Sequence, residues 1–164
     1  MEIIVDSSVA VSVLHGGRNC RACLDVIRKN PFYTIVSCPD WAAHWNKVLG
    51  SADSRTPEHR KFLFEWKSAM LGRKKPITVE SHPCFPIIKS KSEEWDKERL
   101  YLIAVAIQEN CLILYCSTFS ATCDRLSALD HPDIVSIRGN WKKSELPETV
   151  QWLRDNANGS DDAS

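Results

Sequence analysis

Short apolar runs alternate with longer amphipathic stretches along this chain of 164 residues. The apolar runs are rich in β-branched residues and predict strands at residues 3–5, 33–36, 77–80, 111–116 and 133–137. The amphipathic stretches repeat apolar residues at helical spacing and predict helices at residues 8–14, 19–29, 39–49, 58–71, 98–108 and 147–155. Strands separated by helices indicate an α/β protein, and we expect a three-layer α/β/α sandwich around a central, mostly parallel sheet.

The composition suits one ordinary domain. Hydrophobic residues make up 43% of the chain and six are tryptophans, which is enough to fill one core. Because no linker-like stretch divides the chain, we predict a single domain over residues 1–155 and a disordered polar tail over residues 156–164. Lysine and arginine together number 21, as do aspartate and glutamate, so any contact with nucleic acid must come from a local basic patch.

The sequence also sets expectations about location. No apolar run approaches the roughly 20 residues that cross a bilayer, and the short apolar start lacks the basic lead of a signal peptide. We therefore expect a soluble cytoplasmic protein without a membrane partner. In that reducing compartment the seven cysteines are expected to be free, buried thiols.

One motif carries candidate chemistry. The run Ile3-Ile4-Val5-Asp6-Ser7-Ser8 is an apolar strand that ends on a carboxylate and two hydroxyls. Together with three later segments, in the same order and spacing, it resembles a PIN-like domain, the family that includes toxin-type metal-dependent endoribonucleases. The four segments are residues 3–14, 37–49, 100–118 and 133–153.

The resemblance implies a metal site with most of its acidic residues substituted. PIN-like nucleases hold magnesium or manganese on carboxylates at the carboxyl ends of parallel strands, and Asp6 matches the first of these ligands. The positions that match the other three carry His44, Arg99 and Thr118. With this degenerate active site, the resemblance implies weak or no catalysis and a binding or regulatory role towards RNA or a protein partner, such as a second copy or an antitoxin chain.

Three alternatives stay open at this stage. The first is an active magnesium- or manganese-dependent endoribonuclease, in which Asp6 works with Glu98, Asp96 or Asp40 as substitute ligands and Asp6 and Glu98 form the catalytic pair. The second is purely structural: Asp6 caps the following helix, and Arg99 neutralises it across the emptied cleft. The third is an unrelated doubly wound domain that binds a small molecule at the strand ends.

Weaker signals lie elsewhere. The run Arg73-Lys74-Lys75 is a candidate RNA-phosphate contact or a solvated basic face. Cys20 and Cys23 have zinc-like spacing, but both lie on the apolar face of one helix. An exposed tryptophan could stack on a base or fill a partner's pocket, although helical spacing places most of the tryptophans in the core.

Overall fold

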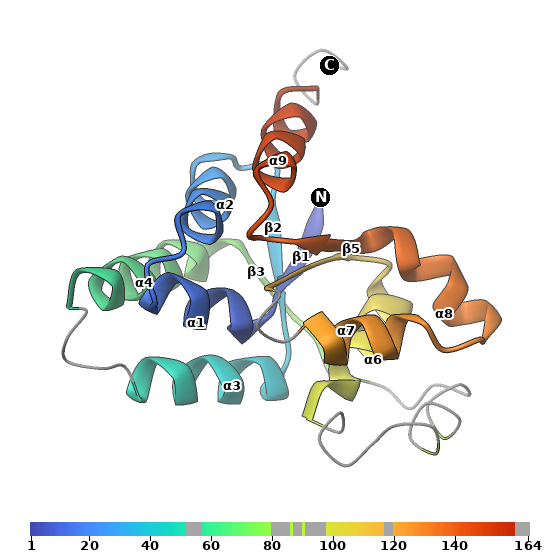
Figure 1. The fold of residues 1–164 in the computed structure, drawn as a ribbon. Coiled ribbons are helices and arrows are strands. Elements are labelled where there is room, and N and C mark those ends of the chain that lie inside the picture. The colour runs from blue at the N-terminus through green and yellow to red at the C-terminus, as the bar shows by residue number, and fades with distance from the viewer. Residues whose placement is uncertain (52–56, 80–85, 87–89, 91–97, 117–119, 160–164) are drawn as a thin grey trace.

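Five parallel strands form the centre of the described structure, in the order β3-β2-β1-β4-β5 (Figure 1). The structure is a computed structural model, and it describes residues 1–51, 57–79, 86, 90, 98–116 and 120–159. The strands are β1 Glu2–Val5, β2 Thr34–Ser37, β3 Lys74–Pro76, β4 Leu112–Tyr115 and β5 Trp141–Lys143.

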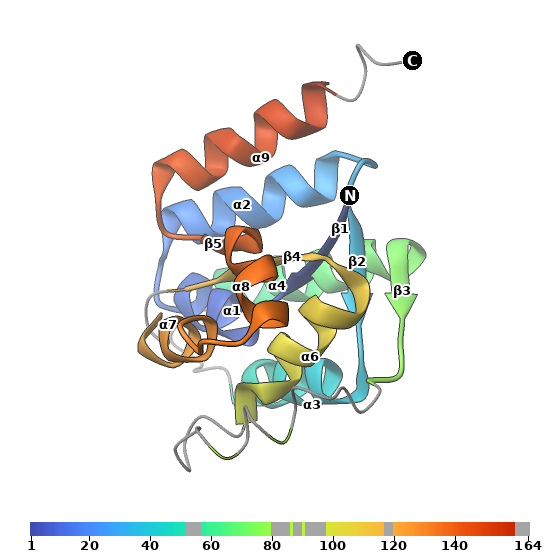
Figure 2. The ribbon, with the colours of Figure 1, turned by 90° about the vertical axis from the view of Figure 1, so that its right-hand side faces the viewer.

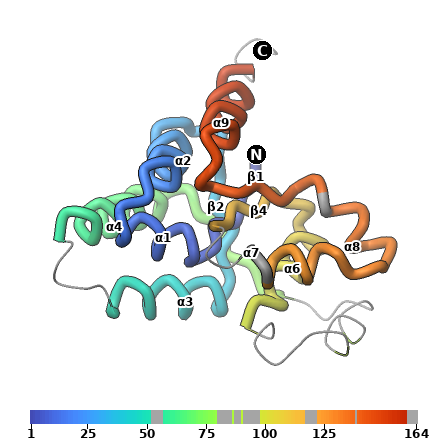
Figure 3. The backbone as a smooth tube through the Cα atoms, viewed as in Figure 1, coloured from blue at the N-terminus to red at the C-terminus, as the bar shows by residue number. Residues whose placement is uncertain are grey.

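Helices cover both faces of this sheet. On one side lie α1 Ser7–Leu14, α2 Arg18–Lys29, α3 Pro39–Gly50, α4 Pro57–Met70 and α9 Pro147–Gly159. On the other side lie α6 Leu100–Glu109, α7 Ser120–Ser127 and α8 Pro132–Ile137, as the tube in Figure 3 shows. Two short 3-10 turns, η1 Leu71–Arg73 and η4 Arg138–Asn140, precede β3 and β5. This arrangement confirms the predicted three-layer sandwich.

The central strands are buried on both faces, which explains their continuous apolar sequences. In β1, Ile3 pairs with Ile35 of β2 on one side and with Leu112 of β4 on the other. β3 lies at the edge of the sheet and reads Lys-Lys-Pro. Charged residues and proline are tolerated at an edge, because one side of that strand needs no partner.

Three tryptophans connect helices α3 and α4 to the end of β1 through hydrogen bonds and ring stacking. The indole nitrogens of Trp41 and Trp45 both donate to the carbonyl oxygen of Val5, at 2.7 and 2.8 Å. Trp45 stacks on Trp66 with ring centroids 5.1 Å apart, and Trp66 in turn donates to the carbonyl of Leu24 in α2. All three tryptophans are fully buried, so the prediction that they belong to the core is confirmed.

Two predicted strands were wrong. Residues 133–137 form helix α8 instead, since Ile134 and Ile137 are buried at helical spacing while Val135 is 46% exposed. The apolar run is so short that it fits both the period of a strand and that of a helix, so it did not distinguish the two structures. The third strand is β3 at Lys74–Pro76 rather than residues 77–80, because an edge strand needs no apolar run. The last strand, β5, was missed at Trp141–Lys143, and helix α7 was also missed.

The carboxyl-terminal helix runs further than expected. α9 extends to Gly159, so the segment predicted to be disordered is helical over residues 156–159, while residues 160–164 lie outside the described part. Ala157 is buried, and α9 packs along α2, as Figure 2 shows from the side. Among the described helices, none has both the length and the apolar character to cross a bilayer.

Candidate functional site

The strand order reverses direction at β1. From β1 the chain adds β2 and β3 on one side and then crosses to add β4 and β5 on the other. In open α/β sheets, ligands bind outside the carboxyl ends of the strands at such a switch point. Asp6 directly follows β1 and Cys116 directly follows β4, and the backbone N–H of Cys116 donates to the hydroxyl of Ser8 at 3.0 Å. A ligand site is therefore expected at this edge of the sheet.

Asp6 is fully buried and caps helix α1. Its backbone is extended, with φ −64° and ψ 146°, and its Oδ2 accepts a hydrogen bond from the backbone N–H of Ser8 at 3.3 Å. Its own N–H donates to the carbonyl of Leu114, which continues the pairing of β1 with β4. A capping aspartate satisfies an unpaired N–H of the first helical turn and also favours the positive end of the helix dipole. The predicted capping role is confirmed.

Arg99 neutralises this carboxylate. Its guanidinium Nη1 forms a short ion pair with Asp6 Oδ2, and only 9% of its side chain is exposed. Arg99 directly precedes α6, so the beginning of that helix places it above the end of β1. A buried carboxylate is costly without a partner, and this pairing, also predicted, supplies one.

Tyr101 joins the pair to His44. The Tyr101 side chain is almost fully buried, and burial, followed by the nearby charge of Asp6, raises the pKa of its hydroxyl well above its ordinary value. Its ring lies against that of half-buried His44 in α3, with centroids 5.3 Å apart. The sequence analysis missed Tyr101, although a single tyrosine in the otherwise apolar helix α6 was a usable signal. We call Asp6, Arg99, Tyr101 and His44 the carboxyl-edge site.

Two buried oxygens of this site lack a hydrogen-bond partner within the described structure: Asp6 Oδ1 and the hydroxyl of Tyr101. Most buried polar atoms in native proteins are paired, and leaving one unpaired costs about 1–3 kcal/mol. Unpaired buried polar atoms of this kind are expected at functional or strained sites.

The described residues do not fit a magnesium or manganese site. Such ions need several oxygen ligands, but the cationic Arg99 occupies Oδ2 of Asp6. Glu98 and Asp40 are exposed, whereas Asp6 is fully buried. Within the described ranges, no three histidine, cysteine or carboxylate side chains are grouped to hold a metal ion. Asp96 and Thr118 lie outside those ranges.

The basic run near β3 is used inside the fold. Arg73 donates to the carbonyls of Asn30, at 2.6 Å, and of Arg28, so it caps the end of α2. The ammonium of Lys74 lies 5.4 Å from the centre of the Trp41 ring. Lys75 pairs with Glu2 and Glu109, at 2.7 and 2.9 Å, and these hydrogen bonds, that with Glu2 first, raise its pKa. The three cations thus engage three separate groups within the fold, and the RNA-phosphate contact stays a prediction.

The thiols beside β4 are protonated structural groups. In α2, the thiol of Cys20 forms a hydrogen bond with the hydroxyl of Ser144 at 3.1 Å. The thiol of Cys23 donates to the carbonyl oxygen of Ser144 at 3.4 Å. A hydrogen bond with Cys116, followed by burial, raises the pKa of Cys20, and burial raises that of Cys23 to about 12. Because a metal ligand or nucleophile must be a thiolate, these shifts weigh against the zinc interpretation. The six described cysteines are free and buried, as predicted.

Comparison with known proteins does not assign a family. The chain matches no protein-family model, and no curated protein or solved structure is significantly similar to it. The fold and the site define its class: a parallel three-layer α/β protein whose switch point carries a buried aspartate–arginine pair.

Proposed function

We propose that this protein is a PIN-like domain that acts by binding RNA, or a protein partner in its place, and does not cleave RNA. The observation that carries the proposal is the buried ion pair between Arg99 and Asp6. The resemblance of segments around Asp6, His44 and Arg99 to PIN-like domains supports the choice of RNA as the partner. The six free thiols support a cytoplasmic location.

The physical argument concerns charge at the end of β1. Metal-assisted phosphodiester cleavage needs divalent ions that activate water and offset negative charge on the phosphate. A guanidinium on Asp6 repels such an ion and occupies the oxygen that it would bind. Recognition of RNA needs no metal, since phosphate contacts and base stacking supply it.

One observation favours a second candidate function, metal-dependent cleavage of RNA. Oδ1 of Asp6 is buried and has no partner in the described structure, so one carboxylate oxygen is still available. If Arg99 moved away, Asp6 could act with Glu98, Asp96 or Asp40 as a magnesium- or manganese-dependent endoribonuclease. This candidate requires a rearrangement that breaks the buried pair.

The test of catalysis is cleavage of a mixed RNA pool with Mn²⁺ or with EDTA. The proteins are the native chain, Asp6→Asn, Glu98→Gln and, as a matched carboxylate control on exposed α9, Asp155→Asn. We expect no Mn²⁺-dependent cleavage by any of them. Cleavage by the native chain that disappears in Asp6→Asn and persists in Asp155→Asn would establish the nuclease instead.

The test of binding uses fluorescence anisotropy with a single-stranded RNA pool in EDTA. We expect affinity that needs no metal and falls steeply with salt, because phosphate contacts release counterions. Absence of RNA binding by the folded native protein would overturn the RNA assignment. A protein partner would then be sought, beginning with self-association measured by sedimentation.

A further inference from the structure

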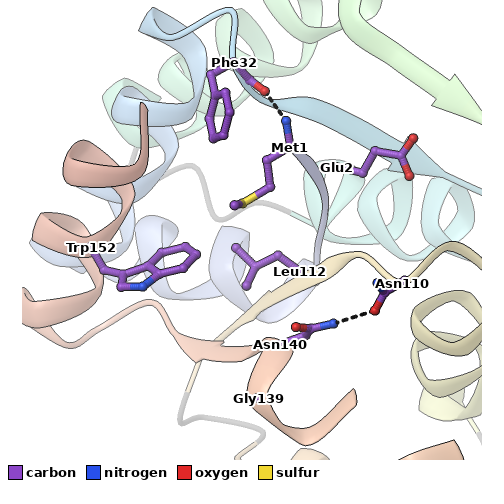
Figure 4. Close-up of a pocket in the computed structure, with 8 residues that line it drawn as sticks. All are labelled: Met1, Glu2, Phe32, Asn110, Leu112, Gly139, Asn140 and Trp152. Atoms are coloured by element: carbon purple, nitrogen blue, oxygen red, sulfur yellow. Dashed lines mark hydrogen bonds between the residues drawn. The ribbon is translucent and has the colours of Figure 1, made fainter. Parts of the chain in front are cut away.

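A pocket of about 490 Å³ opens at the amino edge of the sheet, at the opposite end of β1 from Asp6 (Figure 4). It lies where β1, β2, β4 and β5 begin and where α9 passes over them. Its volume is within the range of roughly 300–1,000 Å³ that small-molecule sites occupy. We call it the amino-edge pocket.

Two aromatic rings form its apolar walls. Phe32, just before β2, and Trp152, on α9, are both half-buried, and Figure 4 shows Phe32 at the top of the pocket and Trp152 at its left. Phe32 is held edge-on by Tyr33, with ring centroids 5.1 Å apart, and the ammonium of Lys142 lies 4.9 Å from the centre of the Trp152 ring. Leu112 lies below them. Rings fixed in this way offer faces on which a planar ligand stacks.

A pair of carboxamides forms the polar edge. Asn140 donates from Nδ2 to Oδ1 of Asn110 at 3.2 Å. Asn110 ends α6 in the left-handed conformation, with φ 49°, which fixes its position between that helix and β4. The shared bond leaves Oδ1 of Asn140 as an acceptor and Nδ2 of Asn110 as a donor, and the described structure gives neither atom a partner. A donor beside an acceptor is the pattern that an asparagine amide presents to adenine.

The local charge favours a neutral ring. Glu2 also lines the pocket, but its carboxylate is paired with Lys75 at 2.7 Å. The α-ammonium of Met1 is the second charged group of the described lining, and it donates to the carbonyl oxygen of Phe32 at 2.5 Å. Both charged groups of the described lining therefore already have partners within the fold. The thioether of Met1 lies between the two rings in Figure 4 and can rotate aside, because methionine has three flexible side-chain bonds.

We propose that the amino-edge pocket binds an adenine base, which stacks between Phe32 and Trp152 and hydrogen-bonds to Asn110 and Asn140. The base could come from a free nucleoside or from an unpaired adenine in RNA, since both present the same ring. This site is separate from the carboxyl-edge site and does not depend on the function proposed there.

The test is isothermal titration of the full-length chain with adenosine, uridine and a short adenine oligoribonucleotide. We expect saturable binding of adenosine or the oligonucleotide, and at least tenfold weaker binding of uridine, because its smaller ring stacks less on the two aromatic side chains. Binding of adenosine identifies a free nucleoside as sufficient, and binding of the oligonucleotide alone identifies RNA as the source.

Four variants locate the binding. Trp152→Leu and Asn140→Ala should each weaken it about tenfold, since each removes one stacking face or one hydrogen-bonding edge. The matched controls are Phe64→Leu, whose ring is 45% exposed on α4, and Asn158→Ala, an exposed amide on α9; both should bind normally. If Trp152→Leu fails to fold, Phe32→Leu replaces it.

Three outcomes would overturn the proposal. The first is no saturable binding of either adenine ligand at millimolar concentration by folded protein. The second is equal binding of uridine. The third is unchanged affinity in both Asn140→Ala and the aromatic variant.

Discussion

The two ends of strand β1 treat polar groups in opposite ways. At the carboxyl edge, Asp6 and Arg99 are both buried and bind each other. At the amino edge, Asn110 and Asn140 line an open pocket and use only part of their hydrogen-bonding capacity. The edge at which α/β sheets usually bind ligands thus carries an internal ion pair, while the amino-edge pocket opens at the other end of β1.

This difference shows how one internal cation can occupy an edge of the sheet. A cation beside Asp6 supplies from within the charge that a ligand or metal would otherwise bring. At the amino edge, the described charged groups bind elsewhere in the fold: Glu2 pairs with Lys75, and the ammonium of Met1 donates to the carbonyl of Phe32.

The largest effect is expected from removing Arg99 alone. Arg99→Met leaves the Asp6 carboxylate buried without a counter-charge, which should lower the free energy of unfolding by about 3–5 kcal/mol. Urea denaturation measures this loss. The double variant Asp6→Asn/Arg99→Met should recover most of it, since asparagine still caps α1 without a charge. A loss below about 1 kcal/mol in the single variant would show that the pair is not buried in solution.

The second-largest loss of stability is expected at alkaline pH, where thiols that are neutral in the folded protein lose their protons in the unfolded chain. Burial raises the pKa of Cys111, at the beginning of β4, and of Cys23 to about 12, from an ordinary value of 9.0. The unfolded chain therefore loses these protons first, so stability is full below pH 9 and falls as the pH rises towards 12. The expected loss by pH 10 is about 1 kcal/mol for each thiol, measured by urea denaturation under reducing conditions.

Cys111→Ala provides the control for this pH effect. It lacks the amino-edge thiol, so its stability should fall less steeply between pH 8 and pH 10 than that of the native chain. Equal slopes for the two proteins would show that Cys111 does not keep its proton through burial.

A smaller loss of stability is expected from removing the hydrogen bond between Tyr33 and helix α9. The hydroxyl of Tyr33 donates to the carbonyl of Leu153 at 2.6 Å and is buried, so Tyr33→Phe should cost about 1–2 kcal/mol. Because Leu153 neighbours Trp152, hydrogen exchange in α9 should also accelerate. Tyr115→Phe, whose hydroxyl bonds the half-exposed Asp124, is the matched control and should leave exchange in α9 unchanged.

The smallest effect is expected from salt. Lys75 is 43% exposed, so its coupling to Glu2, measured by a double-mutant cycle, should be small and should vanish in about 1 M NaCl. The coupling between Arg99 and Asp6 should persist, because buried pairs are screened much less. Equal loss of both couplings would remove the contrast between the two edges.

Much of the fold could be predicted because it depends on local patterns. Apolar β-branched runs identified β1, β2 and β4, and helical spacing identified α2, α4 and α6. The pattern failed at β3, β5 and α8. The two strands are short and lie at the sheet edges, where half of the backbone needs no partner, so their sequences carry little apolar signal.

The candidate site was predictable only in part. Asp6 was identified by its place after a strand, and its pairing with Arg99 was among the predicted alternatives. Tyr101 left a signal as the one tyrosine of α6, but its contact with His44 and the unpaired oxygens of Tyr101 and Asp6 could not be predicted from the sequence. They depend on how closely α3 and α6 approach each other, which is a property of packing.

By itself the sequence determined the three central strands, most of the helices, the aspartate that caps α1 and the neutral overall charge. Only the tertiary structure decided that residues 93 positions apart form the buried pair, and that Phe32, Asn110 and Trp152 share one pocket. The physical reason is the separation along the chain over which each effect acts. Periodicity and capping act over a few residues, whereas burial and cavity shape arise when distant segments pack together.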